Sequence, residues 1–234
     1  MIRRLAAVFA MVLLLTGCAS AIREGAPSSN ISITVAAAQT DFGAFTADAP
    51  DPAAAGSVEE MVCSVLDQYP AGFPAQWGSV EILLVEGLTG QAQFTHGSYA
   101  GFTQRTGDGW LMVLDVTACD AGTVHHEIAH ILDGILTEAG ALTEEEWRSF
   151  CPKGFTYGQT DFEVYSDFFA DAYAMTSMKE DRARTFEDAV LYGAGVYDDR
   201  PALWLKLESF SRAIRSHFNT DGWPQKALWE LALG

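Results

Sequence analysis

Apolar residues follow one pattern before residue 120 and another after it. Residues 79–88 (SVEILLVEGL) and 110–118 (WLMVLDVTA) are apolar with little polar interruption, which is typical of strands inside a sheet. Residues 89–109 are rich in Gly, Thr and Gln and are expected to form a loop or a twisted hairpin. Helical spacing of apolar residues predicts helices at 58–69 (with Ser57 as N-cap), 122–137, 143–150, 162–179, 182–192, 201–218 and 224–233. A small sheet followed by a run of helices predicts an α+β fold.

The first 56 residues differ in composition from the rest of the chain. Two arginines followed by LAAVFAMVLLL have the form of a signal peptide, and the run is too short for a membrane span. It ends in LLTGC, which resembles the lipobox of bacterial lipoproteins and implies cleavage before Cys18 and a lipid on its sulfur. We therefore expect a signal peptide at 1–17, an Ala/Ser/Pro-rich tether at 18–56, and one domain at 57–234. Within the tether, the segment ISITVAAAQ could still form a strand or dock on the domain. This architecture implies an extracytoplasmic protein that a lipid holds to a bacterial membrane.

The net charge and the cysteines limit the possible partners and disulfides. Thirty-one acidic residues against fourteen basic ones give a net charge of −17, which argues against nucleic acid as a partner. Besides Cys18, the chain has Cys63, Cys119 and Cys151. An oxidising compartment allows one disulfide among these three, with three possible pairings. We favour Cys119–Cys151, because the two residues flank the predicted helix at 122–137.

Residues 126–130 spell H-E-x-x-H within that helix. Side chains four apart on an α-helix lie on one face, so His126 and His130 can direct two imidazoles at one zinc ion. Glu127 lies about a quarter turn away, where it can reach a water on the metal and act as a general base. His125 is expected to point away from the metal, either at the surface or behind a ligand. These features predict one Zn²⁺ per chain.

A catalytic zinc needs a third protein ligand. The metzincin continuation requires Gly at position 133 and His at position 136, but the chain has Asp133 and Leu136. Within the predicted helix at 162–179, carboxylates recur every four residues at Glu163, Asp167 and Asp171. Stacked carboxylates repel one another unless a cation lies beside them, which favours a metal role for this stripe.

The HEIAH motif followed by DFFADAYA resembles the gluzincin metallopeptidases, in particular the branch with the catalytic domain of anthrax lethal factor. The resemblance covers residues 110 to 218, including PALWLKLESF. It implies a small zincin-like sheet packed on the HExxH helix, followed by a helical half. It also implies that Asp167 is the third ligand, with Asp171 behind the metal, and that Tyr157 donates to the oxyanion. Asp171 and Asp161 remain alternative ligands, and Tyr165 an alternative donor.

The leading hypothesis is a membrane-anchored zinc metallopeptidase. Attack of a zinc-bound water, with Glu127 as general base, would hydrolyse a peptide or protein substrate held along the strand WLMVLDV. The alternative is a zinc-binding lipoprotein without turnover that binds a protein or cell-wall partner. A structural lipoprotein without metal would leave both the histidine pair and the carboxylate stripe as coincidences. The substrate, the cleavage specificity and the oligomeric state are not predicted.

Overall fold

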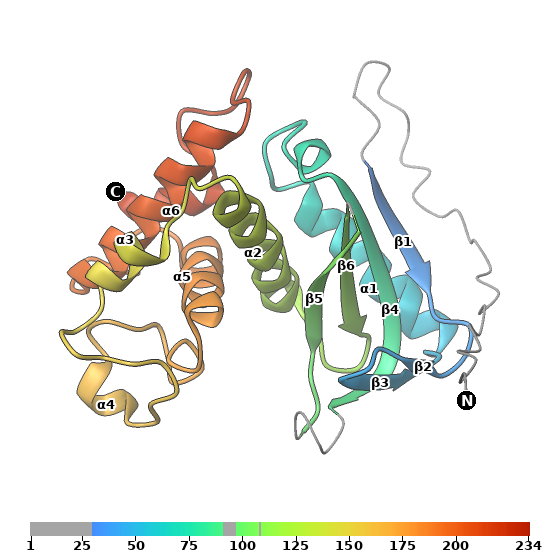
Figure 1. The fold of residues 1–234 in the computed structure, drawn as a ribbon. Coiled ribbons are helices and arrows are strands. Elements are labelled where there is room, and N and C mark those ends of the chain that lie inside the picture. The colour runs from blue at the N-terminus through green and yellow to red at the C-terminus, as the bar shows by residue number, and fades with distance from the viewer. Residues whose placement is uncertain (1–29, 91–96, 108) are drawn as a thin grey trace, which may run out of the picture.

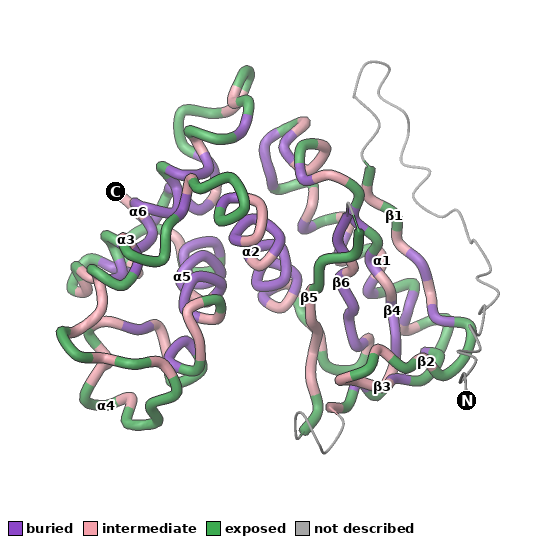
Figure 2. Tube along the Cα trace, in the orientation of Figure 1, coloured by how far each residue is buried: buried purple, intermediate pink, exposed green. Residues whose placement is uncertain are grey.

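The computed structural model describes residues 30–90, 97–107 and 109–234 (Figure 1). The predicted signal peptide and Cys18 lie outside the described residues. The described part of the chain combines a mixed sheet with a helical C-terminal half, which confirms the α+β fold. Helix α2 (Ala121–Glu138) lies between the sheet and the C-terminal helices, and the buried residues concentrate on it and on the elements beside it (Figures 1 and 2).

The sheet is built around the two apolar segments that the sequence analysis identified. They form β4 (Ser79–Gly90) and β6 (Gly109–Asp115), which pair in parallel. The other strands are β1 (Ile31–Val35), β2 (Thr40–Asp41), β3 (Phe45–Asp48) and β5 (Gly101–Thr106). The strand order is β2-β3-β4-β6-β5, and β1 also pairs with β4. Strand β5 (Gly101–Thr106) runs antiparallel to β6 and occupies the edge of the sheet. The segment WLMVLDV is therefore an interior strand with a partner on each side, and the strand at the edge is β5.

Residues in the second half of the predicted tether form strands, including one at the segment ISITVAAAQ. Strand β1 (Ile31–Val35) pairs in parallel with β4, and β2 (Thr40–Asp41) forms an antiparallel pair with β3 (Phe45–Asp48). Alternate apolar residues of β1 pack against the core, and the average composition of residues 18–56 conceals this short pattern. Helix α1 (Pro52–Leu66) also begins earlier than expected, because Asp51 accepts hydrogen bonds from the backbone N–H groups of Ala53 and Ala54.

Helix α2 begins at a capping box. The Asp120 carboxylate accepts from the backbone N–H of Thr123 over 2.8 Å, and Thr123 Oγ1 accepts from the Asp120 N–H. The helix packs closely on the sheet at Gly134, where an added Cβ would lie 2.1 Å from the indole ring of Trp110. The remaining helices are α3 (Glu144–Ser149), α4 (Phe162–Tyr165), α5 (Met178–Tyr192) and α6 (Pro201–His217), with 3₁₀ turns η1 (Pro74–Gln76) and η2 (Leu228–Leu233).

The predicted helix at 162–179 is interrupted. Helix α4 ends at Tyr165, residues 166–176 form turns and irregular structure, and α5 begins after Ser177, whose side chain caps it. Side chains from outside the segment donate hydrogen bonds to backbone carbonyl groups that would accept from backbone N–H groups in a continuous helix. Arg200 donates to the Ser166 and Phe169 carbonyls. Lys206 donates to the Phe168 carbonyl over 2.6 Å. The apolar residues of this segment form a small separate core around Phe169, Ala174 and Met175.

Two further observations concern the cysteines and the membrane. Cys119 and Cys151 are not joined by a disulfide, which contradicts the favoured pairing. Within residues 30–90, 97–107 and 109–234, the search found no helix with the length and apolar character needed to cross a membrane.

Candidate metal centre

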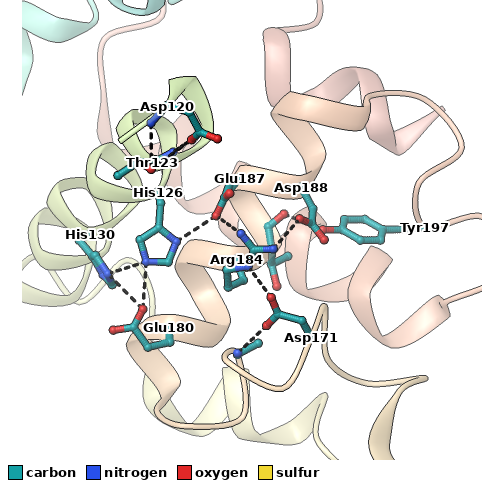
Figure 3. A network of polar contacts seen from close by, with 12 residues as sticks. Asp120, Thr123, His126, His130, Asp171, Glu180, Arg184, Glu187, Asp188 and Tyr197 are labelled. Atoms are coloured by element: carbon teal, nitrogen blue, oxygen red, sulfur yellow. Dashed lines mark hydrogen bonds and ion pairs between the residues drawn. The ribbon is translucent and has the colours of Figure 1, made fainter. Parts of the chain in front are cut away.

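Helix α2 brings His126 and His130 together at its surface facing α5. Their Nε2 atoms lie 3.1 Å apart, and the two rings meet edge to face (Figure 3). This is the arrangement expected of two histidines four residues apart on one helix. The two predicted histidine ligands therefore converge on one point.

The carboxylate that joins them comes from Glu180, in the first turn of α5. Its Oε2 lies 3.0 Å from Nε2 of His126 and 3.4 Å from Nε2 of His130. Among the residues that the structure describes, these three form the one group of His, Cys, Asp and Glu side chains with the spacing of a metal site. Helices α2 and α5 pack against each other along their lengths, and this packing sets the distance between the ligands.

The dimensions of this group fit Zn²⁺. Ligand atoms of a tetrahedral zinc with Zn–N and Zn–O bonds of about 2.0–2.1 Å lie about 3.3 Å from one another. The three ligand–ligand distances here span 3.0 to 3.4 Å. Two imidazoles and one carboxylate also match a known donor set of catalytic zinc, which leaves a fourth position for water or substrate.

The predicted third ligand, Asp167, is not near the histidines. It lies exposed in the turns after α4, because the helix that was to carry the carboxylate stripe ends at Tyr165. The alternative Asp161 is also exposed, and the other alternative, Asp171, forms an ion pair with Arg184 instead. The carboxylate that the structure places with the two histidines is therefore Glu180, not Asp167.

A sequence signal for Glu180 exists. Ser177 followed by Glu180 has the S-x-x-E spacing that marks a helix start, and Ser177 Oγ accepts from the Glu180 N–H over 3.2 Å. Glu187 follows seven residues later, which places it two helical turns further along the same face. The two glutamates contact the same histidine.

Glu187 holds the outer side of His126. Its Oε2 lies 3.0 Å from Nδ1 of His126, the nitrogen that points away from the metal position. A carboxylate in this place fixes the tautomer and the orientation of a ligand imidazole. Burial lowers the pKa of His126, but hydrogen bonds to Glu180 and Glu187 outweigh it and raise that pKa to about 9. The site thus stabilises positive charge, as a cation-binding site must.

Glu127 has the surroundings of a general base. Its side chain is buried and only 4 % exposed, and its Oε2 has no hydrogen-bond donor among the described residues. Thr103 of β5 donates to the Glu127 carbonyl over 3.3 Å, and Gly101 lies so close that a Cβ there would come within 3.3 Å of the glutamate Cγ. Burial raises the pKa of Glu127, although the two histidines oppose the shift.

Neither predicted oxyanion donor is at this site. The Tyr157 hydroxyl donates to Asp181 over 2.8 Å in a buried network with Lys206, and Tyr165 packs on Phe155 in the small separate core. Tyr173 lies there instead: it is 48 % exposed, and its ring centroid is 6.0 Å from that of His126. Burial of the phenol, together with the carboxylates of Glu180 and Glu127, raises the pKa of Tyr173.

His125 is neither a surface residue nor a partner of the ligands. It is buried in the core and its Nδ1 lies 2.8 Å from the Tyr69 hydroxyl. Burial lowers the pKa of His125 to about 4, although the charge of Glu187 opposes the shift. The residue is thus a neutral core histidine at physiological pH.

Comparisons with known proteins found no matching family model, no matching curated protein and no matching solved structure.

Proposed function

We propose that this protein is a zinc-dependent metallopeptidase of the zincin type, with His126, His130 and Glu180 as ligands. The observation that carries the proposal is the triangle of ligand atoms with a buried carboxylate beside it, Glu127, whose Oε2 has no hydrogen-bond donor among the described residues. A zinc site used only for binding or stability has no need of a second, desolvated carboxylate at its edge. A peptidase needs such a carboxylate as its general base, and in this protein Glu127 has that position.

The chemistry divides between the metal and the chain. When bound, Zn²⁺ supplies a Lewis acid that polarises the substrate carbonyl and makes a water molecule more acidic. Glu127 takes a proton from the attacking water as the new C–O bond forms, and then gives a proton to the amine as the C–N bond breaks. A carboxyl pKa that burial has raised suits both steps, because the group must accept the proton and then release it.

Tyr173 is the residue placed to stabilise the charge that develops on the carbonyl oxygen. A tyrosine phenol is protonated at neutral pH, and the raised pKa of Tyr173 leaves it so, which makes it a hydrogen-bond donor. The Tyr173 side chain is 48 % exposed, so a substrate can reach it from solvent.

Strand β5 supports binding of an extended peptide. It lies at the sheet edge beside α2, and Thr103 links it to the backbone of Glu127. A peptide that adds to this edge would take its position from main-chain hydrogen bonds. We further propose that Cys18 carries a lipid, so that the domain works at the outer face of a bacterial membrane.

The substitution Glu127→Gln tests the function. The amide cannot accept a proton, so peptide cleavage should fall at least about a hundredfold while zinc binding remains. The measurement is cleavage of a degenerate peptide mixture by the zinc-loaded protein, detected by mass spectrometry. Glu145→Gln, at an exposed glutamate of α3, is the matched control. If wild-type protein binds zinc but cleaves no more than the Glu127→Gln variant, the peptidase proposal fails and a zinc-binding lipoprotein remains.

A further inference from the structure

The ion pairs behind His126 continue from the metal centre to the turn that carries Tyr173. Arg184 lies on α5, four residues after Glu180. Its Nη1 lies 2.5 Å from Oε2 of Glu187, the same oxygen that faces His126 (Figure 3). Its Nε forms an ion pair with Oδ2 of Asp171 over 2.9 Å, without the alignment of a hydrogen bond. One guanidinium therefore connects two carboxylates that belong to different parts of the chain.

Asp171 uses its second oxygen to hold a turn. Its Oδ1 accepts from the backbone N–H of Ala174 over 2.8 Å, which closes a loop around Tyr173. The Tyr173 carbonyl then accepts from the backbone N–H and the hydroxyl of Thr176, at 3.0 and 2.7 Å. The position of the Tyr173 ring beside His126 thus depends on a turn that Asp171 closes and Arg184 anchors.

The surroundings of Arg184 strengthen its contact with Glu187 more than its contact with Asp171. The Arg184 side chain is 23 % exposed and that of Glu187 only 9 %, whereas that of Asp171 is 37 % exposed. A third carboxylate, Asp188, lies 3.5 Å from Nη2. Ion pairs that are shielded from water in this way are stronger than those at an open surface. A planar guanidinium can contact two carboxylates at once, whereas the ammonium of lysine is a single point of charge.

We propose that Arg184 is a positioning residue that fixes the ligand His126 and the turn of Tyr173 relative to each other. Through Glu187 it orients the imidazole, and through Asp171 it orders residues 171–176. The value of this coupling for catalysis rests on the proposed function. The coupling itself is measurable without any activity.

Zinc affinity tests the branch toward His126. Arg184→Met should weaken zinc binding about tenfold, as loss of a partner behind a ligand does, when measured by competition with a chromophoric chelator. In a Glu187→Gln background the same substitution should have no further effect, because the connection to His126 is already broken. An equal loss in both backgrounds, or no loss in either, would overturn this branch.

Hydrogen exchange tests the branch toward Tyr173. In metal-free protein, Arg184→Met should speed amide exchange of residues 171–176 at least tenfold. Compared with Arg184→Met, Arg184→Lys should recover most of the zinc affinity but not the slow amide exchange of residues 171–176. The reason is that one ammonium cannot contact both Glu187 and Asp171. Arg212→Met removes an arginine from exposed ion pairs with Glu208 and Glu146 and should change neither quantity. Unchanged exchange in Arg184→Met would overturn the proposal.

A kinetic readout separates this proposal from the peptidase itself. If the wild type cleaves peptides, Asp171→Asn should lower kcat about tenfold with KM nearly constant. It should have no effect in a Tyr173→Phe background, where the hydroxyl is already gone. An equal loss in both backgrounds would show that Asp171 does not act through Tyr173. If the wild type binds zinc but cleaves nothing, the proposed function fails, and the affinity and exchange experiments still decide the role of Arg184.

Discussion

Nδ1 of His126 lies 3.0 Å from Oε2 of Glu187, so the same helix that supplies the ligand Glu180 also holds the histidine from behind. The two glutamates are seven residues apart on α5 and contact opposite nitrogens of one imidazole. Packing of α2 on α5 therefore forms both the ligand set and its support. A substitution of either glutamate should lower the affinity for zinc, and the loss should be larger at Glu180 than at Glu187.

Glu187→Gln should weaken zinc binding without abolishing it. The amide oxygen can still accept from Nδ1, but the negative charge that favours a metal-bound imidazole is lost. We expect an affinity about tenfold lower, with one zinc per chain at saturation. Competition with a chelator measures this, and Glu208→Gln, at a half-buried glutamate of α6 that pairs with Arg212, is the control. Affinity equal to that of the wild type would show that Glu187 does not support the ligand.

Gly134→Ala should destabilise the protein, although alanine is normally the better helix former. The new Cβ would lie 2.1 Å from the indole of Trp110, so the ring or the helix must move, at a cost of about 1–3 kcal/mol. Urea unfolding gives the free energy. Gly56→Ala in α1 is the matched control: nothing lies within 4 Å of its added Cβ, and it should gain up to about 1 kcal/mol. Equal effects at the two sites would contradict the close packing of α2 on β6.

Relative to His125→Gln, metal-free wild-type protein should lose stability as the pH falls from 6.5 to 4. The pKa of His125 is about 4 in the folded protein, so below pH 6.5 the unfolded chain takes up a proton that the folded one refuses. The difference corresponds to about 3 kcal/mol, complete near pH 4. His126 acts in another window, since its pKa of about 9 gives stability that is lost as the pH rises from 6.5 to 9. Burial raises the pKa of Asp188 to about 6, which stabilises the folded protein as the pH falls, and this contribution is common to wild type and His125→Gln. The free energy of unfolding in urea should therefore fall further in wild type than in His125→Gln between pH 6.5 and 4.

Lys206 and Asp181 form a buried ion pair that single substitutions should damage severely. Both side chains are fully buried, and Nζ contacts the two carboxylate oxygens at 2.9 and 2.8 Å. Lys206→Met leaves a buried carboxylate without its cation and should cost about 3–5 kcal/mol. The double variant Asp181→Asn/Lys206→Met should recover part of that loss in urea unfolding. A double variant no more stable than Lys206→Met would show that the unpaired charge is not the cause.

The sequence predicted the parts of the site that depend on neighbouring residues in one helix. The spacing of His126 and His130, with Glu127 between them, follows from the helical repeat alone, and the structure places all three beside one another. The buried strands β4 and β6 likewise have clear local patterns. These elements need no information from distant parts of the chain.

The third ligand was missed because it depends on tertiary contacts. The segment 162–179 has a helical pattern, but Arg200 and Lys206 donate to its carbonyl groups and end the helix at Tyr165. Asp167 is thereby removed from the histidines, and Glu180 at the start of the next helix takes its place. Tyr173 was missed for the same reason, since only the folded turn of residues 171–174 brings it to His126.

The most direct test of the central claim is the zinc content of the purified protein after dialysis against a weak chelator. Wild type, Glu180→Ala and Asp167→Ala should be compared under conditions where circular dichroism shows all three to be folded. We predict one zinc per chain in wild type and in Asp167→Ala, and loss of zinc in Glu180→Ala. Zinc retained by Glu180→Ala and lost by Asp167→Ala, or a folded wild type that holds none, would contradict the metal centre formed by His126, His130 and Glu180.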